Sequence, residues 1–208
     1  MESALRSESV VRAKAAIREE MIRVRGKLDD AERSEKSRQI ARRLFELEAF
    51  KKSKAVFFFL SLPREVQTEE MIREAFRLNK EVFVPLVNKE ERRLQVARIP
   101  GMEIEFVRGE YGVREPAPGE REIVAPSRID LVVAPGLAFD PNGGRIGYGA
   151  GYYDRLLQQI PAKAVRIGIG FDFQVRDSVP QTEFDVRVQI VVTETKSLMC
   201  LDSPGAES

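Results

Sequence analysis

The chain has 208 residues, of which 43% are hydrophobic and 32% charged, and its formal net charge is +1. This length and composition predict one domain, or at most one and a half, with a sizeable core. The balanced charge argues against a general nucleic-acid binder, which would show a basic excess. The absence of histidine excludes Ser-His-Asp and Cys-His catalysis and the usual zinc sites. Any chemistry must therefore use carboxylates, Lys, Arg, Tyr, backbone dipoles or a hard cation.

The sequence favours a cytoplasmic protein without a membrane partner. No apolar run approaches the length of a membrane span, and the first residues lack the apolar segment of a signal peptide. The single cysteine, Cys200, rules out an internal disulfide and fits a reducing compartment. We do not expect Cys200 to be catalytic, because no histidine is present to activate it. With balanced charge and no evident exposed apolar stripe, a monomer is the default expectation.

Two helices are predicted in the first fifty residues. One face of the first has apolar residues at helical spacing: Val10, Ile17, Met21, Val24 and Leu28. The other face carries basic residues: Arg12, Lys14, Arg18, Arg23 and Arg25. We interpret most of these as a solvated face. Lys14 and Arg18 are four residues apart and can together grip a phosphate. Asp29, with Glu32 three residues later, predicts a capped start for the second helix.

Residues 54–60 form an apolar run without alternation, which predicts a strand buried on both faces. Glu65 lies in the loop that follows. Ligands of parallel α/β sheets bind outside the carboxyl ends of strands, so Glu65 is a candidate substrate contact. Residues 82–87 predict the next strand, and the alternating residues 94–99 an edge strand.

Residues 106–119 are rich in turn formers and predict a long surface loop, of the kind that is often functional. Tyr111 and Glu115 are candidates to line a pocket there, and an ordinary surface excursion is the equal alternative. Residues 164–171 predict another buried strand, in which Gly168 and Gly170 indicate that a group packs closely against the backbone.

The most informative stretch is a glycine-rich loop between a buried strand, residues 129–134, and a helix, residues 152–160. Its glycines are Gly143, Gly144, Gly147, Gly149 and Gly151. Their spacing matches neither the P-loop nor the dinucleotide fingerprint. Backbone N–H groups converging at a helix start can bind an anion, so we interpret the stretch as a phosphate loop; a flexible connector is the alternative. Arg145 can fork onto phosphate oxygens, and Asp154 is suited to ligate magnesium beside them.

Alternating strands and helices predict an α/β fold with a mostly parallel sheet. We expect residues 1–200 to form one domain and residues 201–208 a disordered tail.

Several segments together resemble the 5-formyltetrahydrofolate cyclo-ligase family. The family motif P-G-x-x-F-D-x-x-G-x-R-L-G-x-G-x-G-Y-Y-D matches residues 135–154 almost throughout, with Ile146 at the leucine position. Supporting matches are the Lys14–Arg18 pair, residues 59–61 followed by Glu65, residues 111–116, residues 179–185 and residues 192–194. The resemblance covers nearly the whole chain.

The resemblance implies a three-layer α/β/α fold related to sugar-phosphate isomerases and CoA transferases. It implies that 5-formyltetrahydrofolate is cyclised with ATP as co-substrate and Mg²⁺ as cofactor. The residues it assigns to ATP are Lys14, Arg18, Arg145, Ile146, Gly147, Tyr148, Gly149, Ala150, Gly151, Tyr152 and Tyr153. Those it assigns to the folate are Leu60, Glu65, Tyr148, Gly149, Ala150, Gly151 and Tyr152. Arg145, Tyr152 and Asp154 are the implied catalytic residues.

The sequence departs from the family pattern at the implied metal site. Asp154 is the main implied ligand and Asp185 a possible helper, but the second acid that members often carry four residues after Asp185 is Gln189 here, a weak ligand at best. Tyr148 and Ala150 stand where some members have basic residues. Two alternatives to the cyclo-ligase stay open: a sugar-phosphate or CoA-ester enzyme on a related fold, and a folate- or nucleotide-binding protein without turnover.

Overall fold

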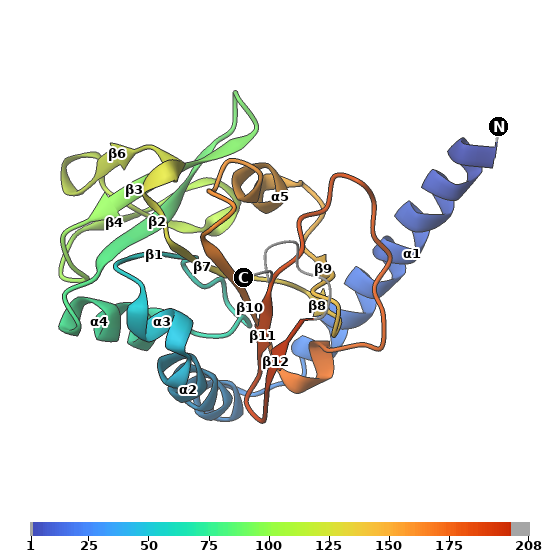
Figure 1. Cartoon of the computed structure of the whole chain (residues 1–208), viewed down its shortest axis with the longest axis horizontal. Helices are drawn as coiled ribbons and strands as arrows, with labels where there is room; N and C mark the ends of the chain where they lie inside the picture. Colours follow the sequence, from blue (N-terminus) through green and yellow to red (C-terminus); the bar gives the residue numbers. More distant parts are fainter. Residues whose placement is uncertain (1, 201–208) are drawn as a thin grey trace.

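An eight-stranded sheet forms the centre of the molecule, in the strand order β12-β11-β10-β7-β1-β2-β3-β6 (Figure 1). The computed structural model describes the backbone of residues 2–200 and the side chains of residues 8–200, so the expected tail, 201–208, lies outside it. The strands are β1 (Ala55–Phe58), β2 (Glu81–Asn88), β3 (Arg93–Ile99), β6 (Glu122–Val124), β7 (Leu131–Ala134), β10 (Val165–Ile169), β11 (Ile190–Val192) and β12 (Ser197–Met199). Strands β11 to β2 are parallel to one another, whereas β12, β3 and β6 are antiparallel to their neighbours. The predicted mostly parallel sheet is confirmed.

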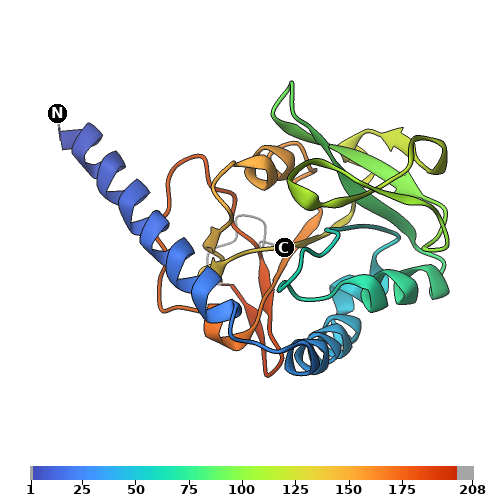
Figure 2. The same cartoon turned by 180° about the vertical axis from the view of Figure 1, so that it is seen from behind.

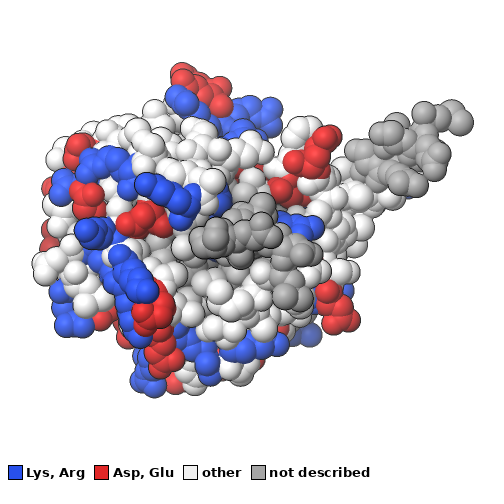
Figure 3. Space-filling view, in the orientation of Figure 1, with Lys and Arg blue, Asp and Glu red and all other residues white. Residues whose placement is uncertain are grey.

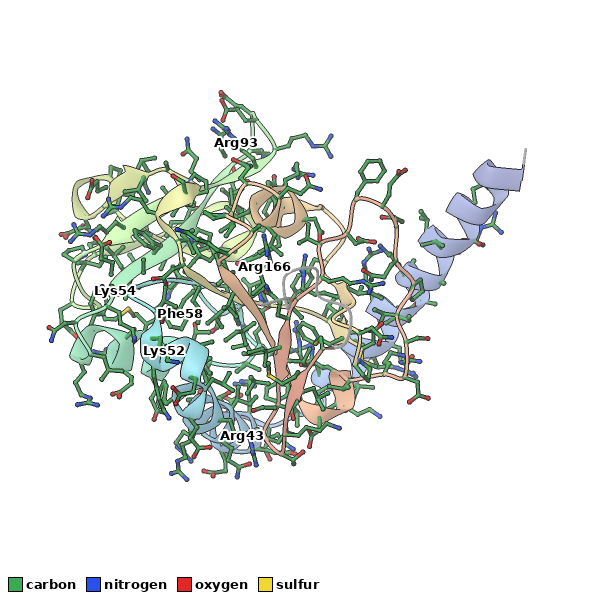
Figure 4. All side chains as sticks on the ribbon, viewed as in Figure 1. Arg43, Lys52, Lys54, Phe58, Arg93 and Arg166 are labelled. Atoms are coloured by element: carbon green, nitrogen blue, oxygen red, sulfur yellow. The ribbon has the colours of Figure 1, made fainter. Side chains whose placement is uncertain are left out.

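Helices cover both faces of this sheet (Figure 1). One face is covered by α2 (Asp30–Glu46), α3 (Glu48–Lys52) and α4 (Glu69–Arg77), and the other by α5 (Tyr152–Leu157). Neighbouring residues of β1 point to opposite faces, so Phe58 packs with the first set of helices (Figure 4) and Phe57 with Leu156 of α5. Two separate cores explain why residues 54–60 are apolar without alternation, and they confirm the three-layer fold.

Helix α1 (Glu2–Arg25) extends away from the body at its N-terminal end (Figures 1 and 2). Its C-terminal half packs Ile17, Met21 and Val24 against the hairpin of β8 (Ala138–Phe139) and β9 (Arg145–Ile146). This contact places the basic face of α1 beside the glycine loop. The carboxylate of Asp29 accepts a 2.8 Å bond from the Glu32 N–H, which confirms the predicted helix cap. Within residues 2–200, none of the helices combines the length and apolar character that a bilayer crossing requires.

Two predictions in the middle of the chain are wrong. Strand β3 is not an edge strand, because the three-residue strand β6 pairs with its outer side. Residues 106–119 are not an irregular loop: β4 (Phe106–Arg108) and β5 (Arg114–Pro116) form an antiparallel hairpin there. The three strands concerned, β4, β5 and β6, have three residues each and are too short to show a periodic pattern in the sequence.

The ring of Phe139 fills the space that three glycines leave. An added Cβ at Gly136 or Gly168 would lie 2.4 Å from this ring, and one at Gly170 would lie 2.9 Å from it. The close approach predicted at Gly168 and Gly170 is therefore confirmed, and Phe139 is its cause. Because Gly136 begins the loop after β7, this packing also fixes where the glycine-rich stretch leaves the sheet.

On the face shown in Figure 3, acidic and basic side chains are interspersed over the helices that cover the sheet. Exposed ion pairs of the molecule include Arg73 with Glu103 and Arg77 with Glu74. Exposed pairs of this kind contribute little to stability, so the two cores carry most of the fold's stability.

Candidate active site

A cleft of about 710 Å³ lies beside the carboxyl ends of β1 and β7. Nearly all of the candidate residues line it: Lys14, Arg18, Leu60, Glu65, Arg145, Ile146, Gly147, Tyr148, Gly149, Ala150, Gly151, Tyr152, Tyr153, Asp154 and Asp185. The wall also includes apolar residues to which the resemblance assigns no ligand: Phe59, Leu62, Pro85, Val87, Leu94 and Val113. Tyr111 lines the cleft as anticipated. Glu115 does not, because its carboxylate accepts a hydrogen bond from the Val87 N–H instead.

The glycine loop runs between β9 and α5 with α1 packed against it. Gly149 and Gly151 have φ values of +106° and +71°, a backbone region that favours glycine. The Arg18 Nε donates to the Gly147 carbonyl at 2.9 Å, and its guanidinium lies 3.3 Å from the Cβ position of Gly149. No side chain caps the start of α5, so an anion there would meet N–H groups that lack a partner within the helix.

Arg145 and Asp154 form a largely buried ion pair at the floor of the cleft. The Arg145 Nη2 donates to Asp154 Oδ1 at 2.8 Å, and its Nη1 donates to the Pro135 carbonyl at 3.3 Å. The Val186 N–H bonds the same Asp154 oxygen at 3.2 Å. These bonds hold the carboxylate by one oxygen and leave Oδ2 for a cation. Arg145 therefore orients Asp154. A direct contact between Arg145 and the phosphate oxygens of ATP stays a prediction.

Lys14 and Asp185 meet across the cleft, linking α1 to the loop before β11. The Lys14 Nζ donates to Asp185 Oδ2, and the same oxygen accepts bonds from the Thr182 N–H and hydroxyl. Burial raises the pKa of Asp185, but the bonds from Lys14 and Thr182 outweigh burial and hold that pKa below its usual range. Asp185 is thus a charged carboxylate that already has several donors, so a metal ion would compete with Lys14 for it.

The side chain of Gln189, expected as a weak metal ligand, is engaged within the sheet. Its amide oxygen accepts a 2.6 Å bond from the Arg166 N–H, and its backbone pairs with Arg166 and Cys200 in the sheet. It does not line the cleft. Residue 189 directly precedes β11, so its side chain bonds to the neighbouring strand of the sheet. Among residues 8–200, no group of three or more Cys, Asp or Glu side chains is arranged to hold a metal ion.

A group of three connected side chains lies at the end of the cleft where the resemblance implies the folate. They are Glu65, Tyr148 and Arg25. Glu65 is only 5% exposed; its Oε2 accepts from the Leu62 N–H and its Oε1 from the Tyr148 hydroxyl, each at 2.9 Å. The Arg25 Nη2 donates to the Tyr148 hydroxyl oxygen, and its Nη1 lies 3.8 Å from Glu65 Oε1. Arg25 was interpreted as part of a solvated helix face, but it is 5% exposed. The sequence pattern of a basic helix face does not show which of its residues will be covered by another segment of the chain.

Aromatic side chains occupy the cleft near α5. The hydroxyls of Tyr111 and Tyr152 lie 3.4 Å apart, which brings the β4–β5 hairpin close to the start of α5. Burial raises the pKa of Tyr153 far above its usual value, so its hydroxyl stays protonated. The Arg155 guanidinium lies 5.2 Å from the Tyr152 ring centre. Such rings can contact a flat heterocycle.

The model of the 5-formyltetrahydrofolate cyclo-ligase family matches residues 10–194. The chain is 28% identical over 200 residues to a probable 5-formyltetrahydrofolate cyclo-ligase of Caenorhabditis elegans, covering 92% of this chain and 97% of that protein. It is 30% identical over 178 residues to the 5-formyltetrahydrofolate cyclo-ligase of Escherichia coli K12, covering 85% and 98%. The solution structure of Aquifex aeolicus 5,10-methenyltetrahydrofolate synthetase superimposes with a TM-score of 0.79 at 32% identity, over 94% of this chain and 96% of that one. With its cleft, glycine motif and fold in agreement, the chain belongs to the 5-formyltetrahydrofolate cyclo-ligase family.

Proposed function

We propose that the protein cyclises 5-formyltetrahydrofolate to 5,10-methenyltetrahydrofolate at the expense of ATP, releasing ADP and phosphate. ATP phosphorylates the formyl oxygen, the second folate nitrogen attacks the formyl carbon, and phosphate leaves as the bridge closes. Phosphoryl transfer depends mainly on positioning and charge neutralisation, so a chain without histidine can perform it. The observation that carries the proposal is a single cleft that joins the glycine loop, Lys14 and Asp154 to Leu60 and Glu65.

The ATP phosphates fit the side of the cleft formed by α1 and the glycine loop. Lys14 and Arg18 supply positive charge from α1, and Arg18 also fixes the loop through Gly147. Asp154 fits a magnesium ion, because Mg²⁺ takes one or two carboxylates plus phosphate oxygens and, among the described residues, no donor bonds the second oxygen of Asp154. When bound, Mg²⁺ would neutralise charge that develops on the transferring phosphoryl group. In this arrangement Asp185 would be the second carboxylate ligand of the Mg²⁺ ion.

The folate fits the side formed by the ends of β1 and β2. Leu60 and Glu65 come from the loop after β1, and Tyr152 supplies an aromatic plane. The apolar wall suits a flat ring system, and the cleft volume is that of a typical small-molecule site. We further propose that the protein acts as a monomer in the cytoplasm, as expected from its balanced charge and single cysteine.

Lys14→Ala tests the nucleotide side of this proposal. We expect the KM for ATP to rise about tenfold or more, because one charge-assisted contact to phosphate is lost, while the KM for 5-formyltetrahydrofolate stays within about twofold. Steady-state kinetics with each substrate varied in turn measures both. Arg12→Ala is the matched control, since Arg12 is exposed on the same helix and its ion-pair partner among residues 8–200 is Glu8, which is outside the cleft. An unchanged KM for ATP would refute the role of Lys14 at the phosphates, and an ATP affinity that is equally unchanged in a direct binding measurement on a protein without turnover would favour a sugar-phosphate or CoA-ester enzyme instead.

A further inference from the structure

We propose that Arg25 is a positioning residue for the folate: acting through the hydroxyl of Tyr148, it holds the buried Glu65 carboxylate ionised and in place for the substrate ring. This inference rests on the proposed function above. It adds to the site a residue outside the glycine loop and the Lys14–Arg18 pair.

The geometry of the three side chains is a directed chain of donors. The Arg25 Nη2 donates to the hydroxyl oxygen of Tyr148, which leaves that hydroxyl's own proton free to donate. The hydroxyl donates to Glu65 Oε1, while the Leu62 N–H donates to Glu65 Oε2. Each carboxylate oxygen thus has one fixed donor, and the carboxyl plane cannot turn without breaking one of them. Arg25 also lies over the Tyr148 ring, 5.5 Å from its centre, so it restrains both ends of the tyrosine.

The Arg25 guanidinium also supplies the positive charge that this buried carboxylate needs. The groups facing Glu65 are Arg25 from α1, Tyr148 from the glycine loop, Tyr153 from α5 and the Leu62 N–H of its own loop. Among the described residues, Arg25 is the one that forms an ion pair with Glu65. A buried carboxylate without a cation tends to protonate. Burial is the largest influence and raises the pKa of Glu65 above its usual value; the Leu62 N–H, Arg25 and Tyr148 reduce that rise without cancelling it.

An ionised Glu65 is what the proposed ligand requires. A pterin ring presents N–H donors, and a carboxylate accepts from them with both oxygens, whereas a carboxylic acid gives up part of this capacity to its own proton. Burial and the neighbouring Glu65 raise the pKa of Tyr148 to about 12, so the phenol keeps its proton at neutral pH and serves Glu65 as a donor. The positive charge beside Glu65 comes from Arg25 of α1.

The test is the kinetics of Arg25→Leu. We expect the KM for 5-formyltetrahydrofolate to rise about ten- to hundredfold at neutral pH, as for loss of a charged hydrogen-bond partner, with the KM for ATP within about twofold. The direction of the pH effect follows from the protonation of Glu65. Its active form is ionised, so activity on folate falls as pH drops through its pKa. Loss of Arg25 raises that pKa, so the acid limb of kcat/KM for folate should move to higher pH.

Three further variants separate positioning from folding. Arg23→Leu is the matched control, since Arg23 is exposed on the same helix, and it should behave as wild type. Arg25→Lys keeps the charge and should recover much of the loss. Tyr148→Phe keeps the ring and removes the relay, so it should raise the folate KM by about three- to tenfold, as for one hydrogen bond, even if Arg25→Leu does not fold.

Two outcomes are distinguishable. If the wild type turns over and neither Arg25→Leu nor Tyr148→Phe changes the folate KM, or if the KM for ATP rises in parallel, the role of Arg25 is refuted while the proposed function stands. If the wild type itself forms no methenyl product, the proposed function fails. Calorimetric binding of 5-formyltetrahydrofolate then tests Arg25 on its own: an Arg25→Leu affinity equal to that of the wild type overturns the inference.

Discussion

Replacing Asp154 with asparagine should lower kcat by about a thousandfold or more, because a metal ion at a transferring phosphoryl group is worth several kcal/mol. The substitution keeps the shape of the side chain, so it tests charge. Oδ1 is held by Arg145 and Val186, and the remaining oxygen is the one that we propose as the Mg²⁺ ligand. Among the described residues no cluster of acids replaces it. Turnover at saturating ATP and Mg²⁺, measured by methenyl product formation, gives the effect.

Two comparisons make this result specific. Asp177→Asn changes an exposed aspartate on the loop before β11 and should leave kcat unchanged. Asp185→Asn should cost less than Asp154→Asn, since Asp185 is already bonded by Lys14 and Thr182. A thermal melt of each variant shows whether the fold is intact. Rates like those of the wild type in Asp154→Asn would refute its metal role, and a larger loss in Asp185→Asn would transfer that role to Asp185.

The largest effect on stability is expected from Phe139→Ala, which should lower the free energy of unfolding by about 3–5 kcal/mol. The ring is fully buried, and the atoms around it include the backbones of Gly136, Gly168 and Gly170. Glycine has no side chain that can move into the space, so the cavity would remain open. Such a loss is a large part of the total stability of a domain of this size. Urea unfolding followed by circular dichroism measures it.

Ile123→Ala is the control for that prediction. Ile123 lies on the short outer strand β6 and is 52% exposed, so its truncation should change the free energy of unfolding by about 0.5 kcal/mol or less. Equal effects of the two substitutions would show that the three glycines do not confine the ring. Because Gly136 lines the cleft, we also expect Phe139→Ala to lose activity below its melting temperature.

The sheet and the glycine motif were predictable because each has a strong local signal. The continuous apolar run of residues 54–60 predicts burial on both faces, and Phe57 and Phe58 indeed enter opposite cores. The glycines of the loop reflect backbone requirements at Gly149 and Gly151. Strand β6 and the β4–β5 hairpin were missed, since three-residue strands depend on their partners for stability and leave no period in the sequence.

The position of a side chain in the cleft was predictable where its residue type and its place in a motif both pointed to the cleft, as for Lys14, Glu65 and Asp154. The pairing of side chains was not predictable. No feature of the neighbouring sequence shows that Arg145 pairs with Asp154, or that Arg25 donates a hydrogen bond to the hydroxyl of Tyr148. The Arg25 contact joins segments 123 residues apart and depends on how α1 packs on the hairpin of β8 and β9. The Arg145 contact spans the glycine loop. The bond of the Gln189 side chain was not predictable either, because its partner Arg166 is on another strand.

The most direct measurement is the folate turnover of the purified protein. It is mixed with 5-formyltetrahydrofolate, ATP and Mg²⁺, and the near-ultraviolet absorbance of the methenyl product is followed with time. The cyclo-ligase assignment predicts that the absorbance grows, that it requires ATP, and that omission of Mg²⁺ suppresses it. A folded protein that forms no methenyl product under these conditions would contradict the assignment. If that protein still bound the folate tightly in calorimetry, it would be a binding protein without turnover.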